Sequence, residues 1–118
     1  MAKRDGLFLY DAKNHELIRK GNEDLRAISG KQSFVGTAPV NLVFVADMDK
    51  AADEEHDKRF LVAADTGFIS QNVYLYCAVM GLATVVRVTT NPEVLSKAMG
   101  LADNQLITMA QCVGYPKA

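Results

Sequence analysis

Residues 65–86 read DTGFISQNVYLYCAVMGLATVV and form a long, mostly apolar run. Apolar residues recur at helical spacing through it and just before it, at Phe60, Ala64, Phe68, Val73, Tyr76 and Met80. Other apolar residues fill the gaps, so we predict a helix from about Arg59 to Met80 that is covered on most of its sides. Gly81 suits a left-handed helix cap, and the β-branched residues from Ala83 to Val88 predict a strand directly after it.

The uncharged stretch from Thr66 to Val86 approaches the length that spans a bilayer. Polar residues and Gly81 interrupt it, and its end has strand character. We therefore expect a buried helix followed by a buried strand, and no membrane partner. The polar residues before Leu7 leave no room for the apolar segment of a signal peptide, so we expect a cytoplasmic protein.

Shorter elements are predicted on both sides of this stretch. After it, Asn91-Pro92-Glu93 opens a helix that runs through Met99, and Gly100 closes it. The other predicted elements are a hairpin with strands at Leu7–Asp11 and Glu16–Arg19, a short helix at Glu23–Ser29, a central strand at Val40–Ala46 and a last strand at Gln105–Val113. Strands and helices alternate without βαβ regularity, which predicts an α+β fold with a mixed or antiparallel sheet packed against the long buried helix.

The composition is that of an ordinary globular protein. Of the 118 residues, 49% are hydrophobic and 23% are charged, so we expect one domain over residues 1–118 with its own core. The 13 Lys and Arg residues nearly balance the 14 Asp and Glu residues, which excludes a general nucleic-acid binder. Charge is concentrated from Asp47 to Arg59, and we predict a solvated loop or helix start there rather than a metal site.

The sequence contains no complete catalytic or metal-binding signature. Asp47-Met-Asp-Lys50 follows the central strand where a dinucleotide-binding loop needs glycines, and we identify no catalytic residue. Cys77 and Cys112 lack the spacing of a zinc or redox motif and are predicted to be buried free thiols. Four further residues with ligand chemistry are predicted to be solvated, namely His15, Glu54, Glu55 and His56.

Four motifs follow one another in an order that resembles the flavin-dependent nitroreductase superfamily. They are an Ala38-Pro39 entry into the central strand, a helix bearing Gln71-Asn72 and ending in Gly81-Leu82, a short helix ending at Met99-Gly-Leu101, and a last strand finishing in Gly114-Tyr-Pro116. The resemblance spans roughly Leu7 to Lys117. It implies an FMN-dependent oxidoreductase that takes reducing equivalents from NAD(P)H and passes them to an electron-poor small molecule. It also implies a homodimer whose core is the long helix.

The sequence departs from the family pattern at its beginning. Family members carry an Arg-Ser-x-Arg motif in an early helical segment that holds the flavin phosphate, and nothing before Leu7 matches it. We therefore expect the carboxyl-terminal part of the family fold, truncated at the N-terminus, with impaired flavin binding. The alternative is a non-catalytic dimerising fragment that keeps the fold and has lost the cofactor. An unrelated ligand-binding module is a third hypothesis.

The resemblance also implies cofactor-binding residues. It places the strand after Gly81 near the isoalloxazine ring of the flavin. The backbones of Arg87, Val88 and Thr89 are therefore candidates for contact with the flavin N5 edge. The Arg87 side chain ends an apolar run, so it requires either water at the edge of the sheet or an anionic partner such as a reduced flavin. Lys117 lies where family members often send a basic side chain to the flavin phosphate.

Gln71 and Asn72 lie within the predicted buried helix. Buried amides need hydrogen-bond partners, because an unsatisfied amide costs about 1 to 3 kcal/mol. We expect these two side chains to tie the helix to the sheet or to a second subunit.

Overall fold

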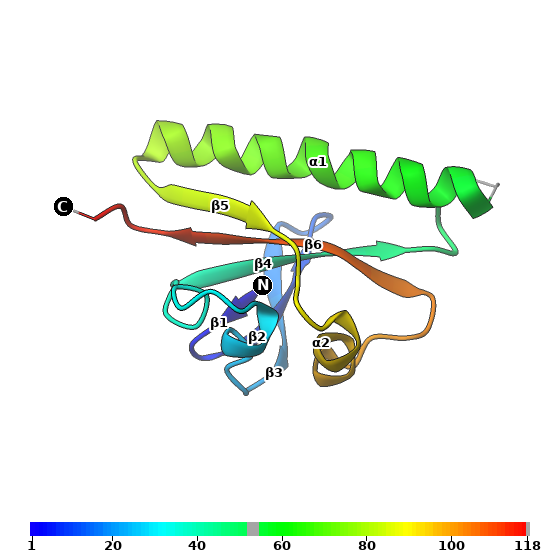
Figure 1. Ribbon diagram of the computed structural model, residues 1–118, viewed down its shortest axis with the longest axis horizontal. Helices are drawn as coiled ribbons and strands as arrows, with labels where there is room; N and C mark the ends of the chain where they lie inside the picture. The colour runs from blue at the N-terminus through cyan, green and yellow to red at the C-terminus, as the bar shows by residue number, and fades with distance from the viewer. Residues whose placement is uncertain (52–54, 118) are drawn as a thin grey trace.

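The computed structural model describes residues 1–51 and 55–117 and has an α+β fold (Figure 1). Its helical elements are the 3-10 turn η1 (Ala27–Ser29), α1 (Glu55–Met80) and α2 (Pro92–Met99). Its strands are β1 (Ala2–Lys3), β2 (Gly6–Asp11), β3 (Glu16–Gly21), β4 (Val40–Asp47), β5 (Ala83–Arg87) and β6 (Gln105–Gly114). The α+β prediction is confirmed.

The strands form one sheet in the order β3-β2-β1-β4-β6-β5, and every neighbouring pair is antiparallel. The longest ladder joins β4 to β6, from Val40 opposite Val113 to Asp47 opposite Gln105. Both strands are rich in apolar residues, which suits their place inside the sheet. Figure 1 shows α1 along one side of the sheet, with α2 on the other side.

The long helix α1 begins at Glu55, earlier than the predicted start near Arg59, because the charged residues before Phe60 form its first turns. Its inner face is buried against β5 and β6 through Thr66, Ser70 and Cys77. Its outer face is apolar and exposed: Phe60 is 74% exposed and Val79 is 84% exposed. The prediction that this helix is covered on most sides is therefore wrong for the single chain.

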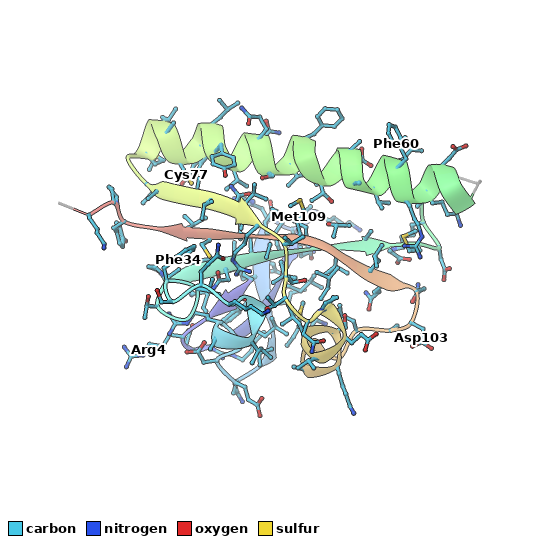
Figure 2. All side chains as sticks on the ribbon, viewed as in Figure 1. Arg4, Phe34, Phe60, Cys77, Asp103 and Met109 are labelled. Atoms are coloured by element: carbon cyan, nitrogen blue, oxygen red, sulfur yellow. The ribbon has the colours of Figure 1, made fainter. Side chains whose placement is uncertain are left out.

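Figure 2 shows this asymmetry, with Phe60 pointing away from the sheet and Cys77 pointing toward it. The predicted transition from helix to strand is confirmed, since α1 ends at Met80 and Gly81 takes a positive φ of 71°. Within the described residues, no helix combines the length and apolarity that crossing a membrane requires.

A second layer covers the opposite face of the sheet. The Asn91 side chain accepts a hydrogen bond from Val94 N and caps α2, and Gly100 ends α2 with a φ of 72°. Leu25 packs with Ala2 and Leu7 in a small core cluster, and Met99 of α2 covers it. This layer holds η1 and α2 together beside the end of β5.

Two of the short elements differ from the prediction. The helix predicted over Glu23–Ser29 shrinks to η1, because the Asp24 carboxylate accepts from Arg26 N and holds a tight turn before it. The two-residue strand β1 was not predicted, since it exists only by pairing with β2 and β4. The predicted hairpin is confirmed as β2 and β3, and the Asp11 carboxylate accepts from Lys13 N in its turn.

Candidate functional site

The candidate site is the carboxyl end of β5, where the sequence analysis placed Arg87, Val88 and Thr89. Arg87 is the last residue of β5 and is only 7% exposed. Its guanidinium donates to the carbonyl and hydroxyl oxygens of Ser29, to Asn41 Oδ1 at 2.9 Å and to Cys112 Sγ at 3.2 Å. The predicted requirement for water or an anion is therefore wrong, because neutral groups of the protein satisfy this side chain.

Two further contacts complete what we call the Arg87 cluster, defined as Arg87, Ser29, Asn41 and Cys112. Asn41 Nδ2 donates to the carbonyl oxygen of Val35 at 2.8 Å, and Cys112 Sγ donates to Asn41 Oδ1 at 2.7 Å. Each polar atom of Asn41 thus has a partner although the residue is fully buried. The cluster joins β4, β5 and β6 to the segment that contains η1.

The opposite face of the sheet carries a second buried set, the Ser70 cluster, defined as Ser70, Gln111 and Thr84. Ser70 Oγ donates to Gln111 Oε1 at 2.9 Å, and Gln111 Nε2 donates to Thr84 Oγ1 at 3.0 Å. All three residues are neutral, and they tie α1 to β6 and β5. A threonine pair, Thr66 and Thr108, makes a similar contact of 2.7 Å nearer the start of α1.

The end of β5 presents backbone groups to the outside, because β5 is an edge strand. Tyr74 Oη accepts from Val86 N at 2.8 Å on the side away from β6. Beyond Arg87 the chain leaves the sheet, with Val88 72% exposed and Thr89 half-buried. These are the residues at which a ligand can approach the backbone.

Lys117 lies elsewhere in the single chain. Gly114 pairs with Ala83 at the start of β5, whereas Arg87 pairs with Ala110 at its end. Four residues of strand at about 3.3 Å each already separate these two points by about 13 Å. Figure 1 shows the residues that follow β6 extending beyond the side where β5 begins. Within one chain the structure therefore brings Arg87, Val88 and Thr89 together and leaves the exposed Lys117 apart from them.

The other residues singled out by the sequence have different fates. Cys77 and Cys112 are buried free cysteines, as predicted. His15 is exposed in its turn, as predicted, and its Nδ1 lies 2.7 Å from Tyr10 Oη. Glu54 and the side chains of Glu55 and His56 lie outside the described part of the chain. Among the described residues no group of histidine, cysteine and acidic side chains is arranged to hold a metal ion.

Gln71 and Asn72 are exposed on α1, so they do not tie this helix to the sheet within the single chain, and their contact with a second subunit stays a prediction. Both follow Ser70, which occupies the sheet-facing position, and helical spacing turns them outward. Asn72 instead lines an open, mainly apolar cavity of about 420 Å³ between α1 and the sheet. Ile69, Tyr76 and Val40 are among the other lining residues.

Sequence reasoning missed Ser29, Asn41 and Gln111. The only signal for the last two is a polar residue inside an otherwise apolar strand, at Val40–Asp47 and at Gln105–Gly114. A buried polar residue of this kind must find a partner, but the sequence does not say which one.

The segment before Ser29 carries the clearest electrostatic pair. Arg26 contacts the Asp24 carboxylate at 2.8 Å, and this hydrogen bond lowers the pKa of Asp24 below its ordinary value. The same contact raises the pKa of Arg26. Arg26 Nη1 also donates to the carbonyl oxygen of Ala38 at 3.0 Å, which closes the loop that delivers Ser29 to Arg87.

Comparison with known proteins identifies the fold. The model of the family described as the nitroreductase family matches residues 5–115. The chain belongs to the nitroreductase family. A crystal structure from Ralstonia eutropha, named as a nitroreductase, is similar at a TM-score of 0.91 and 36% identity, over 99% of this chain and 56% of that one.

Two other family relatives extend this comparison. A Methanocaldococcus jannaschii protein, assigned by name to the nitroreductases, is 30% identical over 86 residues, which are 69% of this chain and 43% of that protein. A structure from Anabaena variabilis shares the fold at a TM-score of 0.82 and 16% identity, over 95% of this chain and 24% of that one. This nitroreductase-family chain thus spans about half the length of the first relatives it matches.

Proposed function

We propose that this chain is part of an FMN-dependent oxidoreductase that passes reducing equivalents from NAD(P)H to an electron-poor small molecule. The observation that carries the proposal is the family match over residues 5–115, which includes the exposed end of β5. Membership of the family supports an oxidoreductase role. The flavin, the nicotinamide donor and the residues that contact them are our proposals.

The residues of the chain fit one part of a flavin and not another. Val88 and Thr89 offer backbone groups and an exposed apolar side chain beside the edge of the sheet, which suits the rim of a flat ring. The phosphate requires cations, and the Arg87 guanidinium is already bonded to Ser29, Asn41 and Cys112. Lys117 is the proposed phosphate contact, and within one chain it lies apart from the ring contact.

Bound flavin would supply the electron-transfer chemistry itself, which is why the chain needs no catalytic triad. The protein residues bind and orient the ring. The backbone N–H of Val88 is the proposed hydrogen-bond donor toward the N5 edge, and Thr89 forms the adjacent wall. Val88 lacks the close backbone approach that glycine permits, so this contact is made at the open edge of β5.

Replacing the backbone donor tests the proposal. Val88→Pro removes the N–H of residue 88, and Arg87 before it already has the extended conformation that proline requires. Val88→Ala is the matched control, because it keeps the N–H and removes most of the side chain. We expect FMN to shift the amide resonances of residues 86–90 in the parent and in Val88→Ala. Shifts that are identical in Val88→Pro, or that map to another surface, contradict the assignment.

The exposed outer face of α1 favours a second candidate, a dimerising fragment without flavin. Phe60, Phe68 and Val79 are each more than 70% exposed, and isolated domains rarely leave so much apolar surface on one helix. A second copy of this chain is the proposed occupant of this face. The two candidates share the dimer and differ in flavin binding, so a colourless protein that gains no flavin on addition favours the fragment.

Light scattering tests the homodimer. Tyr76→Glu places a charge on the flank of the outer face, where Tyr76 is 60% exposed in the single chain. We expect the parent to be a dimer at micromolar concentration and Tyr76→Glu to be a monomer or to lose solubility. Gln32→Glu is the control, since it adds the same charge to an exposed loop residue. A monomeric parent contradicts the dimer.

A further inference from the structure

Arg87 is the one charged side chain among the buried residues that the structure describes. The groups that bond it are a carbonyl, a hydroxyl, a side-chain amide and a thiol, all of them neutral. A cation buried without an acidic partner is costly for a protein. The cluster therefore calls for an explanation beyond the stability of the fold.

The contacts use the planar shape of the guanidinium rather than its charge alone. Nη1 donates to the carbonyl oxygen of Ser29 and Nη2 donates to its hydroxyl oxygen, while Nε donates to Cys112 Sγ. A Cβ atom on Gly30 would lie 2.7 Å from Nη1 and 3.1 Å from Cζ of Arg87, so the backbone of Gly30 is packed closely against the guanidinium. The three N–H donors of a lysine ammonium share one nitrogen, so lysine does not reproduce the planar, forked arrangement of donors on the guanidinium.

The place of the Arg87 cluster in the chain shows which backbone segment it fixes. β5 is an edge strand that is paired only with β6, and its last residue is Arg87. The link that follows is fixed at its far end by the Asn91 cap of α2, which packs against η1. Through Ser29, Arg87 fixes the near end of the same link to η1.

We propose that Arg87 is a positioning residue that sets the backbone of Val88 and Thr89 for the flavin ring, an inference that rests on the proposed flavin function. It acts through Ser29 and Asn41 and does not itself touch the cofactor. A direct electrostatic role would need only a positive charge at residue 87. A positioning role needs the planar, forked donors of the guanidinium.

Backbone order measured without flavin is the first test. In the parent, we expect amide order parameters of about 0.85 at residues 88 and 89, as in rigid backbone. In both Arg87→Lys and Arg87→Met they fall to about 0.6 or lower. Ser70→Ala, on the opposite face of the sheet, is the control and leaves them unchanged. Unchanged order in both Arg87 variants, or full restoration by lysine, overturns the inference.

Flavin binding, followed by amide shifts on titration with FMN, is the second test. We expect both Arg87 variants to weaken binding about tenfold, or about 1.4 kcal/mol, while Ser70→Ala does not. If Arg87→Lys retains FMN binding and Arg87→Met loses it, the positioning role is overturned, because a positive charge at residue 87 is then sufficient. A parent that binds no FMN overturns the proposed function. The order parameters then still decide whether the Arg87 cluster fixes the backbone of residues 88 and 89. If the Arg87 variants do not fold, Ser29→Ala, which removes one acceptor, takes their place in both tests.

Discussion

The two faces of the sheet carry two different kinds of buried polar cluster. The Arg87 cluster holds a full charge and joins β5 to Ser29, 58 residues earlier in the chain. The Ser70 cluster is neutral and joins α1 to its own supporting strands. A neutral hydrogen bond contributes about 1 kcal/mol and its partners are replaceable, whereas an orphaned buried cation destabilises strongly. The comparison shows that a cluster built around a buried charge joins one face of the sheet to a distant segment, whereas a neutral cluster ties α1 to the other face.

Asn41→Leu should show the largest effect in this comparison. It removes one acceptor from Arg87 and the donor to the Val35 carbonyl, and all of these groups are buried. We expect a loss of about 3 to 5 kcal/mol in the free energy of unfolding, measured by urea denaturation. A loss below about 1 kcal/mol would mean that water enters the Arg87 cluster and replaces the amide.

Gly30→Ala tests the close approach of the guanidinium with a smaller change. The φ of Gly30 is −176°, which any residue adopts, so backbone strain plays no part. The new Cβ forces Nη1 to move from its bond to Ser29. We expect a loss of about 1 to 3 kcal/mol, as for overpacking in a core. Gly67→Ala in α1 is the control, because a Cβ there meets nothing within 4 Å and raises helix propensity. Equal stability of Gly30→Ala and the parent would contradict the packed geometry.

Ser70→Ala should cost less, since it removes one neutral hydrogen bond to Gln111. We expect about 1 kcal/mol in the same urea titration. Adding Gln111→Leu should recover part of that loss, because both polar partners are then replaced by apolar groups. A double variant that is much less stable than either single variant would contradict the view that apolar groups can replace the polar partners of the Ser70 cluster.

Asp24→Asn should have the smallest effect and a characteristic pH dependence. The Arg26 contact lowers the pKa of Asp24, so its contribution is present above the ordinary carboxyl pKa and is lost as pH falls through the folded value. The pair is partly exposed and screened, so we expect at most about 0.5 kcal/mol at pH 7. Thermal melts of parent and variant should converge in acid, once the pH falls below the lowered pKa of Asp24. A difference that persists in acid would contradict the ion pair as its cause.

Local patterns explain the parts of the fold that the sequence predicts. Helical spacing and Gly81 place α1 and β5, and Asn91 with Gly100 bounds α2, because each signal lies within a few residues of the element it controls. The pairing that creates β1 and the side-chain turn at Asp24 lack such a signal. Those features depend on partners that other parts of the chain bring into place.

The sequence names the residues proposed for the candidate site, but it does not reveal which side chains bond to Arg87. The family resemblance points to Arg87, Val88 and Thr89, and the structure keeps them together at the end of β5. Ser29, one of the partners of Arg87, lies 58 residues away in a segment predicted to be an ordinary helix, so no local pattern reveals this contact. The exposure of Gln71 and Asn72 was missed because apolarity on every side of α1 hides which face meets the sheet.

We propose that this chain holds the ring edge of FMN without a complete phosphate site. Each charge-assisted bond to a phosphate contributes roughly 1.5 to 3 kcal/mol, and the sequence lacks the two-arginine motif of the family. At about 1.4 kcal/mol per tenfold change in affinity, we expect this absence to weaken a submicromolar site by two or more orders of magnitude.

Fluorescence-quenching titration of FMN with the 118-residue chain measures this affinity. We expect saturable binding in the high micromolar range, with little or no nicotinamide-dependent reduction. Submicromolar binding by this chain would contradict it, because a complete phosphate site would then be present within these residues.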